Sequence, residues 1–242
     1  MLSVKKLDDK FKTLLDKALT YYTSDDTNIR FFGRVPLSRY HTLKYCFEEF
    51  EKNNMKTVVE LGTSRSFVDG RYEGCNSDNS KFWEPEKSEK WDWAAGCFTK
   101  TTSTCLEHID GFHLTTVDLI QNHINRCKIM NSNTNNIDYY VMPSEEFLST
   151  TTNKIDLLYL DTGDMTPILP TAQLHLREAQ IIVERDLVNE NGIILIDDIR
   201  SAVPYEHGEN IDLGKGFLSI PYFLENGFEL IMDEYQTVLR KK

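Results

Sequence analysis

The sequence has few basic residues beside its many acidic ones. Lys and Arg together number 27 against 38 Asp and Glu in 242 residues, which gives a formal net charge of −11 at pH 7. An electrostatic field of that sign repels polyanions at long range. We therefore do not expect duplex nucleic acid to be a partner.

The sequence also lacks long apolar runs. Runs such as 193–196 are far shorter than the roughly 20 residues of a membrane-spanning helix, and residues 1–6 lack the apolar core of a signal peptide. Five cysteines, an odd number without a CxxC pair, favour neither a disulfide framework nor a structural zinc site. These absences predict a cytoplasmic protein with reduced thiols and no membrane partner.

The rest of the composition is that of an ordinary globular protein. With 40% apolar and 27% charged residues, we expect a single domain over 1–242. Apolar side chains at three- and four-residue spacings predict an amphipathic helix over 5–22. A second helix is expected to start at 36–39 and to end at Asn53 and Asn54. We interpret 1–55 as N-terminal helices that cover the domain.

From residue 56 onward, strand, turn and helix patterns alternate. A helix is predicted over 170–187, and an edge hairpin pairs 228–232 with 235–239. Short continuous apolar runs are typical of strands buried on both faces of a parallel sheet, and they occur at 57–61, 114–117, 139–142, 155–160 and 193–196. The predicted fold is α/β, with a Rossmann-like, doubly wound, mostly parallel sheet and a C-terminal antiparallel edge hairpin.

The loop after the first predicted strand reads Glu60-Leu61-Gly62-Thr63-Ser64. Open α/β sheets bind ligands beyond the carboxyl ends of their strands. Gly62 lets the backbone pass close to a ligand, while Thr63, Ser64 and exposed amides can bind polar groups. The loop lacks GxGxxG and a following Gly-Lys-[Ser/Thr], which argues against a dehydrogenase and a P-loop. Taken alone, it is equally compatible with a structural turn.

Two later features match this loop. Asp118 ends the second strand, where an acid commonly binds the ribose hydroxyls of an adenine cofactor. After the third strand, Met142 can lie against an adenine ring with Ser144 nearby. Ser144 is also a good helix N-cap, and the two roles are compatible.

Together these residues resemble class I S-adenosylmethionine-dependent methyltransferases, from residue 56 to about 240. The resemblance implies S-adenosylmethionine as cofactor, with contacts from Glu60, Gly62, Thr63, Ser64, Asp118, Met142, Ser144 and Asp161. Members of that family usually enter a helix directly after the glycine loop. Here an insertion over 67–96 precedes Cys97 and Phe98.

Two predicted strands end in acids. Asp161 follows 155–160, and Asp197 with Asp198 follows 193–196. If the strands are neighbours, they lie about 5 Å apart and their terminal carboxylates converge. Such carboxylates repel one another unless they are protonated or neutralised by a cation, and an all-oxygen site suits Mg²⁺.

This acidic pattern resembles the metal-dependent O-methyltransferases, particularly those acting on sugars, in which three acids hold Mg²⁺ beside the methyl donor. The resemblance implies Asp161, Asp197 and Asp198 as ligands of Mg²⁺ or another divalent cation. The ion would bind the substrate hydroxyls and lower the pKa of the attacking one. Alternatively, one acid caps a helix and the others face solvent, and Asp164 is another possible ligand.

Two residues are predicted to be catalytic. Asp161 lies at the centre of the expected site, and His207 lies in a loop after Asp198 that should overhang it. His175, in the predicted helix after Asp161, is a further histidine near the site. For each histidine, a surface or core position is the alternative.

The insertion carries an unusual number of aromatic residues. Side chains there can pack against sugar C–H surfaces or form a small satellite core closing over the sheet, and they comprise Tyr72, Phe82, Trp83, Trp91 and Trp93. A second wall is expected at 213–219, where Lys215 can meet an acidic substrate.

The sequence thus predicts a metal-assisted O-methyltransferase acting on a sugar, nucleotide sugar or other small polar metabolite. A metal-independent N- or carboxyl-methyltransferase and a non-catalytic cofactor-binding module are the alternatives. The sequence leaves the oligomeric state open, with a homo-oligomer as one option.

Overall fold

The computed structural model describes residues 1–15, 38–63, 85–91, 93, 97–164, 167–199 and 214–242. Seven strands form one sheet in the order β3-β2-β1-β4-β5-β7-β6. Their bounds are Thr57–Leu61 (β1), His113–Asp118 (β2), Ile137–Val141 (β3), Ile155–Leu160 (β4), Val188–Ile196 (β5), Phe228–Asp233 (β6) and Thr237–Lys241 (β7). Strands β1 to β5 pair in parallel, whereas β7 is antiparallel to β5 and β6. The predicted doubly wound sheet and its edge hairpin are confirmed.

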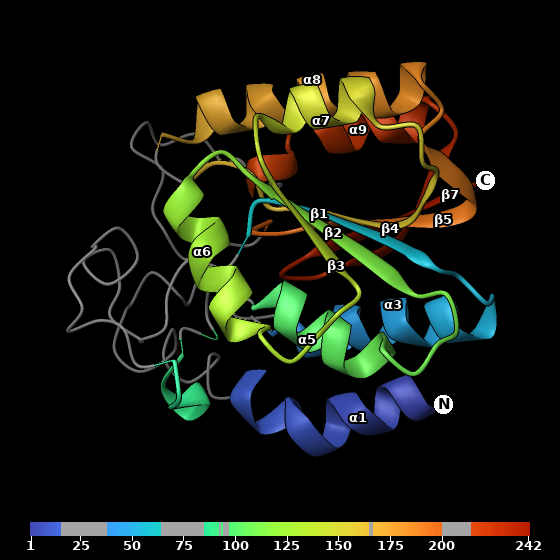
Figure 1. Ribbon diagram of the computed structural model, residues 1–242. Coiled ribbons are helices and arrows are strands. Elements are labelled where there is room, and N and C mark those ends of the chain that lie inside the picture. Colours follow the sequence, from blue (N-terminus) through green and yellow to red (C-terminus); the bar gives the residue numbers. More distant parts are fainter. Residues whose placement is uncertain (16–37, 64–84, 92, 94–96, 165–166, 200–213) are drawn as a thin grey trace, which may run out of the picture.

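Helices cover both faces of this sheet (Figure 1). On one face lie α1, α3 and α5, with α1 on the outside, and on the other face lie α7, α8 and α9. The helices span Leu2–Lys10 (α1), Tyr40–Lys52 (α3), Phe98–Leu106 (α5), Gln121–Met130 (α6), Ser144–Thr150 (α7), Ile168–Glu184 (α8) and Ser219–Glu225 (α9). Short 3-10 helices lie at Ser88–Lys90 (η3) and Gly214–Gly216 (η5).

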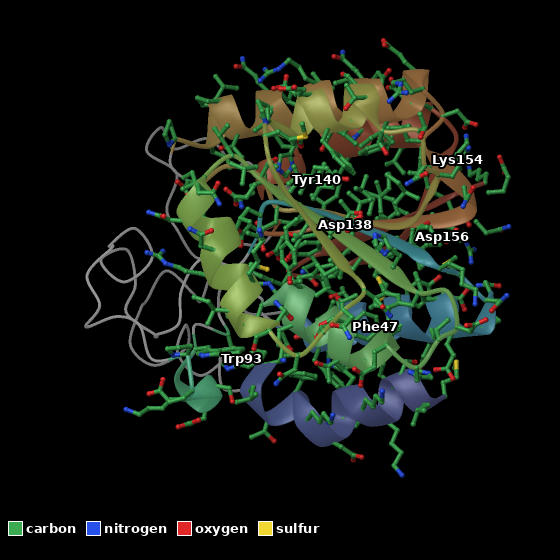
Figure 2. All side chains as sticks on the ribbon, viewed as in Figure 1. Phe47, Trp93, Asp138, Tyr140, Lys154 and Asp156 are labelled. Atoms are coloured by element: carbon green, nitrogen blue, oxygen red, sulfur yellow. The ribbon has the colours of Figure 1, made fainter. Side chains whose placement is uncertain are left out.

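The central strand β4 explains the continuous apolar runs of the sequence. Leu157 and Tyr159 point into the core beneath α1, α3 and α5, whereas Leu158 and Leu160 point into the core beneath α7, α8 and α9. Successive strand residues face opposite sides, so a strand covered on both faces needs apolar residues at every position. Figure 2 shows Phe47 of α3, which is fully buried, within the first of these cores.

Several predicted bounds differ from the structure. Strand β5 begins at Val188, five residues before the predicted start, because the polar positions 189–191 give no apolar pattern. Helix α1 ends at Lys10, and 16–22 of the predicted first helix lie outside the described residues. Helix α3 ends, as expected, next to Asn53.

Two further expectations concern cysteines and membranes. The described cysteines at 46, 97, 105 and 127 are buried, and no disulfide joins any two of these four. None of the helices within the described ranges combines the length and the apolar character that crossing a bilayer requires.

Candidate cofactor site and acidic cluster

The predicted site residues lie where the sheet reverses its strand order. Strand β1 has β2 on one side and β4 on the other, so its carboxyl end faces the topological switch point between β1 and β4. Four of the predicted residues come from the ends of these strands and the loops that follow them: Glu60, Gly62, Asp118 and Asp161.

Gly62 fits the structure only as glycine. Its φ is +87°, and a Cβ added there would lie 2.4 Å from the carbonyl oxygen of Asp161. Its amide donates to the carbonyl oxygen of Val117 at 2.8 Å. The loop after β1 is therefore held against the ends of both β2 and β4, as a close backbone approach requires.

Glu60 is a buried carboxyl group bound by hydroxyl groups. Thr116 donates to its Oε2 at 2.5 Å, Thr63 donates at 3.4 Å, and Thr99 of α5 donates to the same oxygen. Burial raises the pKa of Glu60 to about 7, although these hydrogen bonds oppose the shift. Glu60 thus ties α5 to the cofactor loop from within the core.

Asp118 is positioned by three donors. Its Oδ2 accepts the amide of Thr63 at 3.1 Å, and its Oδ1 accepts the amide of Ile120 at 2.8 Å and pairs with His123 Nδ1 at 3.1 Å. The side chain retains 11% exposure. Asp118, which is predicted to bind the ribose, is therefore hydrogen-bonded directly to the predicted glycine loop.

Met142 and Ser144, the two residues predicted to lie near the adenine ring, both contact other parts of the chain. Met142 is half-buried against the core beneath α8, and its amide donates to the Asp118 carbonyl oxygen at 3.1 Å.

Ser144 is the first residue of α7, and its hydroxyl donates to buried Glu178 rather than capping the helix. Thr162 donates to the same carboxylate at 2.9 Å, and burial raises the pKa of Glu178 to about 7. The predicted N-cap role of Ser144 is therefore wrong, because Pro143 occupies the N-cap.

The three predicted acids do meet. One carboxylate oxygen from each of Asp161, Asp197 and Asp198 lies within 4.8 Å of the others. Asp164 is exposed and is not part of this cluster. The convergence follows from the parallel register of β4 and β5, in which Leu160 is paired with Ile196.

The cluster contains two positive charges that the sequence analysis did not place there. Lys215 Nζ lies 2.7 Å from Asp161 Oδ1 and 2.9 Å from Asp198 Oδ2, and it is almost completely buried. Arg39 Nη2 lies 2.7 Å from Asp197 Oδ2, and its Nε lies 3.0 Å from both oxygens of Asp197. The acids are therefore neutralised largely from within the chain.

Neutral donors complete the cluster. Tyr159 donates to Asp197 Oδ2 at 2.7 Å, Gln236 Nε2 lies 3.0 Å from Asp197 Oδ1, and Tyr235 donates to Asp198. Burial raises the pKa of Asp198, but Lys215 and Arg39 outweigh burial and hold that pKa well below its usual range. Asp197 is fully buried, whereas the Asp161 and Asp198 side chains remain about one-fifth exposed at 20% and 19%.

The fold is similar to that of solved methyltransferases. The SAH-bound Podospora anserina methyltransferase PaMTH1 is similar with a TM-score of 0.53 and 12% identity, over 99% of this chain and 93% of that one. The O-methyltransferase from Bacillus cereus, in complex with SAH, has a TM-score of 0.51 and 10% identity, over 98% and 96%. This chain has the methyltransferase fold. At the sequence level, no protein-family profile and no curated protein matches, so the likeness is one of fold.

Helix α5 begins at Phe98, after the predicted insertion over 67–96 and Cys97. Two of the aromatic residues of that insertion belong to the core. Trp91 and Trp93 are each 5% exposed and stacked with ring centroids 6.0 Å apart, and Phe11 contacts Trp93. For these two residues the structure supports a buried core position rather than a sugar-binding surface, and that core is the one beneath α1, α3 and α5 rather than a separate satellite core. Tyr72, Phe82 and Trp83 lie outside the described residues.

The histidine predictions have different outcomes. His207 and Ser64 lie outside the described residues, so both remain predictions. His175 is completely buried in α8, its Nε2 lies 3.0 Å from the Thr162 carbonyl oxygen, and burial lowers its pKa to about 3. A neutral, buried His175 is the core histidine of the alternative interpretation.

Sequence reasoning missed the partners that hold the predicted residues in place. Thr99, Thr116 and His123 have no motif and meet Glu60 or Asp118 only through the fold. Lys215 was expected to face an acidic substrate, and it instead pairs with two acids of its own chain. The signal that was available is its position between Gly214 and Gly216, which permits a tight backbone approach.

Proposed function

We propose that this chain is an S-adenosylmethionine-dependent methyltransferase that methylates a hydroxyl group of a sugar, nucleotide sugar or other small polar metabolite. The observation that carries the proposal is the bond between the glycine loop and Asp118, made by the Thr63 amide at the switch point. A loop that presses against the β4 backbone and orients the β2 acid is suited to a nucleoside ligand. The methyltransferase fold supports the same interpretation.

Asp118 is proposed to bind the ribose. A carboxylate offers about four acceptor positions, and the amides of Thr63 and Ile120 with His123 occupy three of them. Among the described residues, no donor takes the fourth position, which lies on Oδ2, and we propose that a ribose hydroxyl binds there. Because those three donors fix the carboxylate, little side-chain entropy is lost when the hydroxyl binds. Glu60, Gly62, Thr63 and Ser64 are proposed near the methionine end, and Met142 and Ser144 near the adenine.

In the proposed reaction, an acceptor oxygen attacks the sulfonium methyl carbon. The O–C bond forms as the S–C bond breaks, SAH leaves, and the hydroxyl proton passes to a base. Asp161 is proposed to face the acceptor, because it is partly exposed and its backbone contacts the glycine loop at Gly62. His207 remains the proposed base.

The sequence predicts divalent-metal assistance, but the donor set of the acidic cluster fits a metal ion poorly. Each carboxylate of the cluster already has a cationic partner, and the oxygens of Asp197 together accept from Arg39, Tyr159 and Gln236. A cation needs oxygens with open acceptor positions. We therefore derive no step through a metal ion. This observation favours a second candidate function, metal-independent transfer to a nitrogen or a carboxylate.

Titration calorimetry with S-adenosylmethionine and SAH tests the proposal. We expect wild type to bind both, and Asp118→Asn to bind about 10- to 100-fold more weakly, since a hydrogen bond to a charged group contributes roughly 1.5–3 kcal/mol. Asp138→Asn is the matched control, because it removes the same charge from an exposed side chain on neighbouring β3 (Figure 2). Absence of binding by wild type would contradict the proposal. Binding without turnover on any acceptor would favour a non-catalytic module.

A further inference from the structure

The acidic cluster has a nearly complete internal charge balance. Three carboxylates, from Asp161, Asp197 and Asp198, face the ammonium of Lys215 and the guanidinium of Arg39. Carboxylates this close repel one another strongly in a buried site unless cations neutralise them. The question is whether the chain supplies those cations itself or takes one from solution.

The backbone around Lys215 is built to bring its ammonium group to this place. Gly214 has a φ of +47°, and a Cβ added there would lie 2.1 Å from the carbonyl oxygen of Asp198. A Cβ on Gly216 would lie 2.7 Å from the side chain of Ile220. The turn η5 therefore packs tightly against the end of β5 and the start of α9, and it carries Lys215 between its two glycines.

The ammonium group lies where a bridging ion would have to bind. Lys215 Nζ is 2.7 Å from Asp161 Oδ1 and 2.9 Å from Asp198 Oδ2, so it links the end of β4 to the end of β5. An ion coordinated by those oxygens would stand about 2.0–2.6 Å from each. Both cations cannot occupy this space, because they would overlap and repel each other.

The third acid offers no alternative position. Asp197 is fully buried, and its oxygens accept from two nitrogens of Arg39, from Tyr159 and from Gln236. An ion at Asp197 would have to displace a bidentate arginine pair, which is among the stronger charge-assisted contacts. An ion at Asp197 would thus compete with Arg39, just as an ion between Asp161 and Asp198 would compete with Lys215.

We infer that Lys215 takes the place of a divalent ion, so that this cluster is a lysine-neutralised, metal-free site. Lys215 is then a positioning residue that holds Asp161 and Asp198 together at the ends of β4 and β5. The inference concerns the charge balance of the cluster, and it does not rest on the proposed methyl transfer. We therefore expect a variant that lacks the Lys215 ammonium group to gain a metal site.

The test measures Mn²⁺ binding by electron paramagnetic resonance on wild type, Lys215→Met and Lys154→Met. Lys154 lies at the far, amino end of β4 in an exposed pair with Asp186 (Figure 2), so its variant carries the same change in net charge away from the cluster. We expect Lys215→Met to bind one Mn²⁺ per chain at least about tenfold more tightly than wild type, a difference of about 1.4 kcal/mol. Lys154→Met is expected to bind like wild type.

The opposite result is equally clear. If wild type binds one Mn²⁺ and Asp198→Asn abolishes that binding, the inference is overturned, and it is also overturned if folded Lys215→Met binds no more Mn²⁺ than Lys154→Met. Should Lys215→Met fail to fold, the comparison of wild type with Asp198→Asn still decides: no Mn²⁺ on either supports the inference. Cofactor calorimetry is a separate measurement, so failure of one proposal is distinguishable from failure of the other.

Discussion

At the scale of single residues, Gly62 is constrained in two ways in the glycine loop. Its positive φ is unfavourable for any residue with a Cβ, which is a conformational constraint. A Cβ there would also collide with the Asp161 backbone, which is a separate steric constraint. Gly227 shares only the first constraint, because its φ is +90° and no atom lies within 4 Å of an added Cβ. The two glycines therefore allow strain and collision to be measured separately.

We predict that Gly62→Ala is more destabilising than Gly227→Ala. Both substitutions place a side chain in the left-handed region at a cost of about 1–2 kcal/mol, and Gly62→Ala adds about 1–3 kcal/mol for displacing the β4 backbone. Urea unfolding gives both values. Gly62→Ala should also weaken S-adenosylmethionine binding, whereas Gly227→Ala should not. Equal destabilisation by the two variants would show that the contact with Asp161 is unimportant.

Glu60 provides a prediction about pH. Because burial raises its pKa to about 7 in the folded chain, the folded state holds a proton that the unfolded chain releases nearer its ordinary value of 4.5. The folded state binds more protons than the unfolded state between those values, so stability falls as pH rises from about 4.5 to 7. The full shift corresponds to at most about 3 kcal/mol.

Glu60→Gln removes this titration while keeping a group that can accept from Thr99 and Thr116. We expect its free energy of unfolding to change less between pH 5 and pH 7.5 than that of wild type, by up to about 3 kcal/mol. Glu178→Gln is expected to act similarly and independently, since Glu178 has the same raised pKa in a different contact set. If the free energy of unfolding of Glu60→Gln depends on pH as strongly as that of wild type, the raised pKa does not belong to Glu60.

At the scale of elements, the Arg39–Asp197 pair connects the N-terminal helices to the sheet. Arg39 is the N-cap residue of α3, and Asp197 directly follows β5, so the pair spans 158 positions of sequence. The Arg39 guanidinium also lies over the ring of Tyr235, which precedes β7. One side chain thus joins α3, β5 and the hairpin.

We predict that Arg39→Met costs about 3–5 kcal/mol, because it leaves the buried Asp197 carboxylate without its cation. The double variant with Asp197→Asn should recover part of that loss, since the uncompensated charge is then gone. Arg177→Met is the control at an exposed pair with Glu145, where we expect less than about 1 kcal/mol. Denaturant unfolding of wild type, Arg39→Met, Asp197→Asn and the double variant measures the cycle. Additive losses would mean that the pair contributes nothing specific.

At the scale of the whole molecule, a net charge of −11 attracts divalent ions in general without binding them at a defined place. A specific site would stabilise the folded state according to its affinity and the free ion concentration. If Lys215 and Arg39 already occupy the positions at which an ion would bind, there is no such site to fill.

We therefore predict that wild type unfolds at the same temperature, within about 1 °C, in EDTA and in millimolar Mg²⁺ at matched ionic strength. Turnover on an acceptor should likewise persist after metal removal. Lys215→Met should behave differently and melt at a higher temperature with Mg²⁺ than with EDTA. A clear rise in wild type alone would indicate a metal site in the native protein.

The sequence predicted most of the sheet because its signals are local. Apolar runs covered on both faces located β1 and β4 at their observed bounds, and the positions of Glu60, Gly62, Asp118 and Asp161 at strand ends followed from them. The polar start of β5 was missed because residues 189–191 carry no periodic pattern. Trp91 and Trp93 could not be assigned, because their stacking on each other and the contact of Trp93 with Phe11 depend on chain packing rather than on composition.

What the sequence determined by itself was the sheet, the glycine loop and the meeting of three acids at neighbouring strand ends. Only the tertiary structure decided what neutralises those acids. Arg39 precedes β1 and Lys215 follows β5, and nothing near either residue in the chain indicates a partner. Charge pairing inside a core depends on which distant side chains the packed elements bring within a few ångströms. That distance is a property of the fold and not of any local pattern.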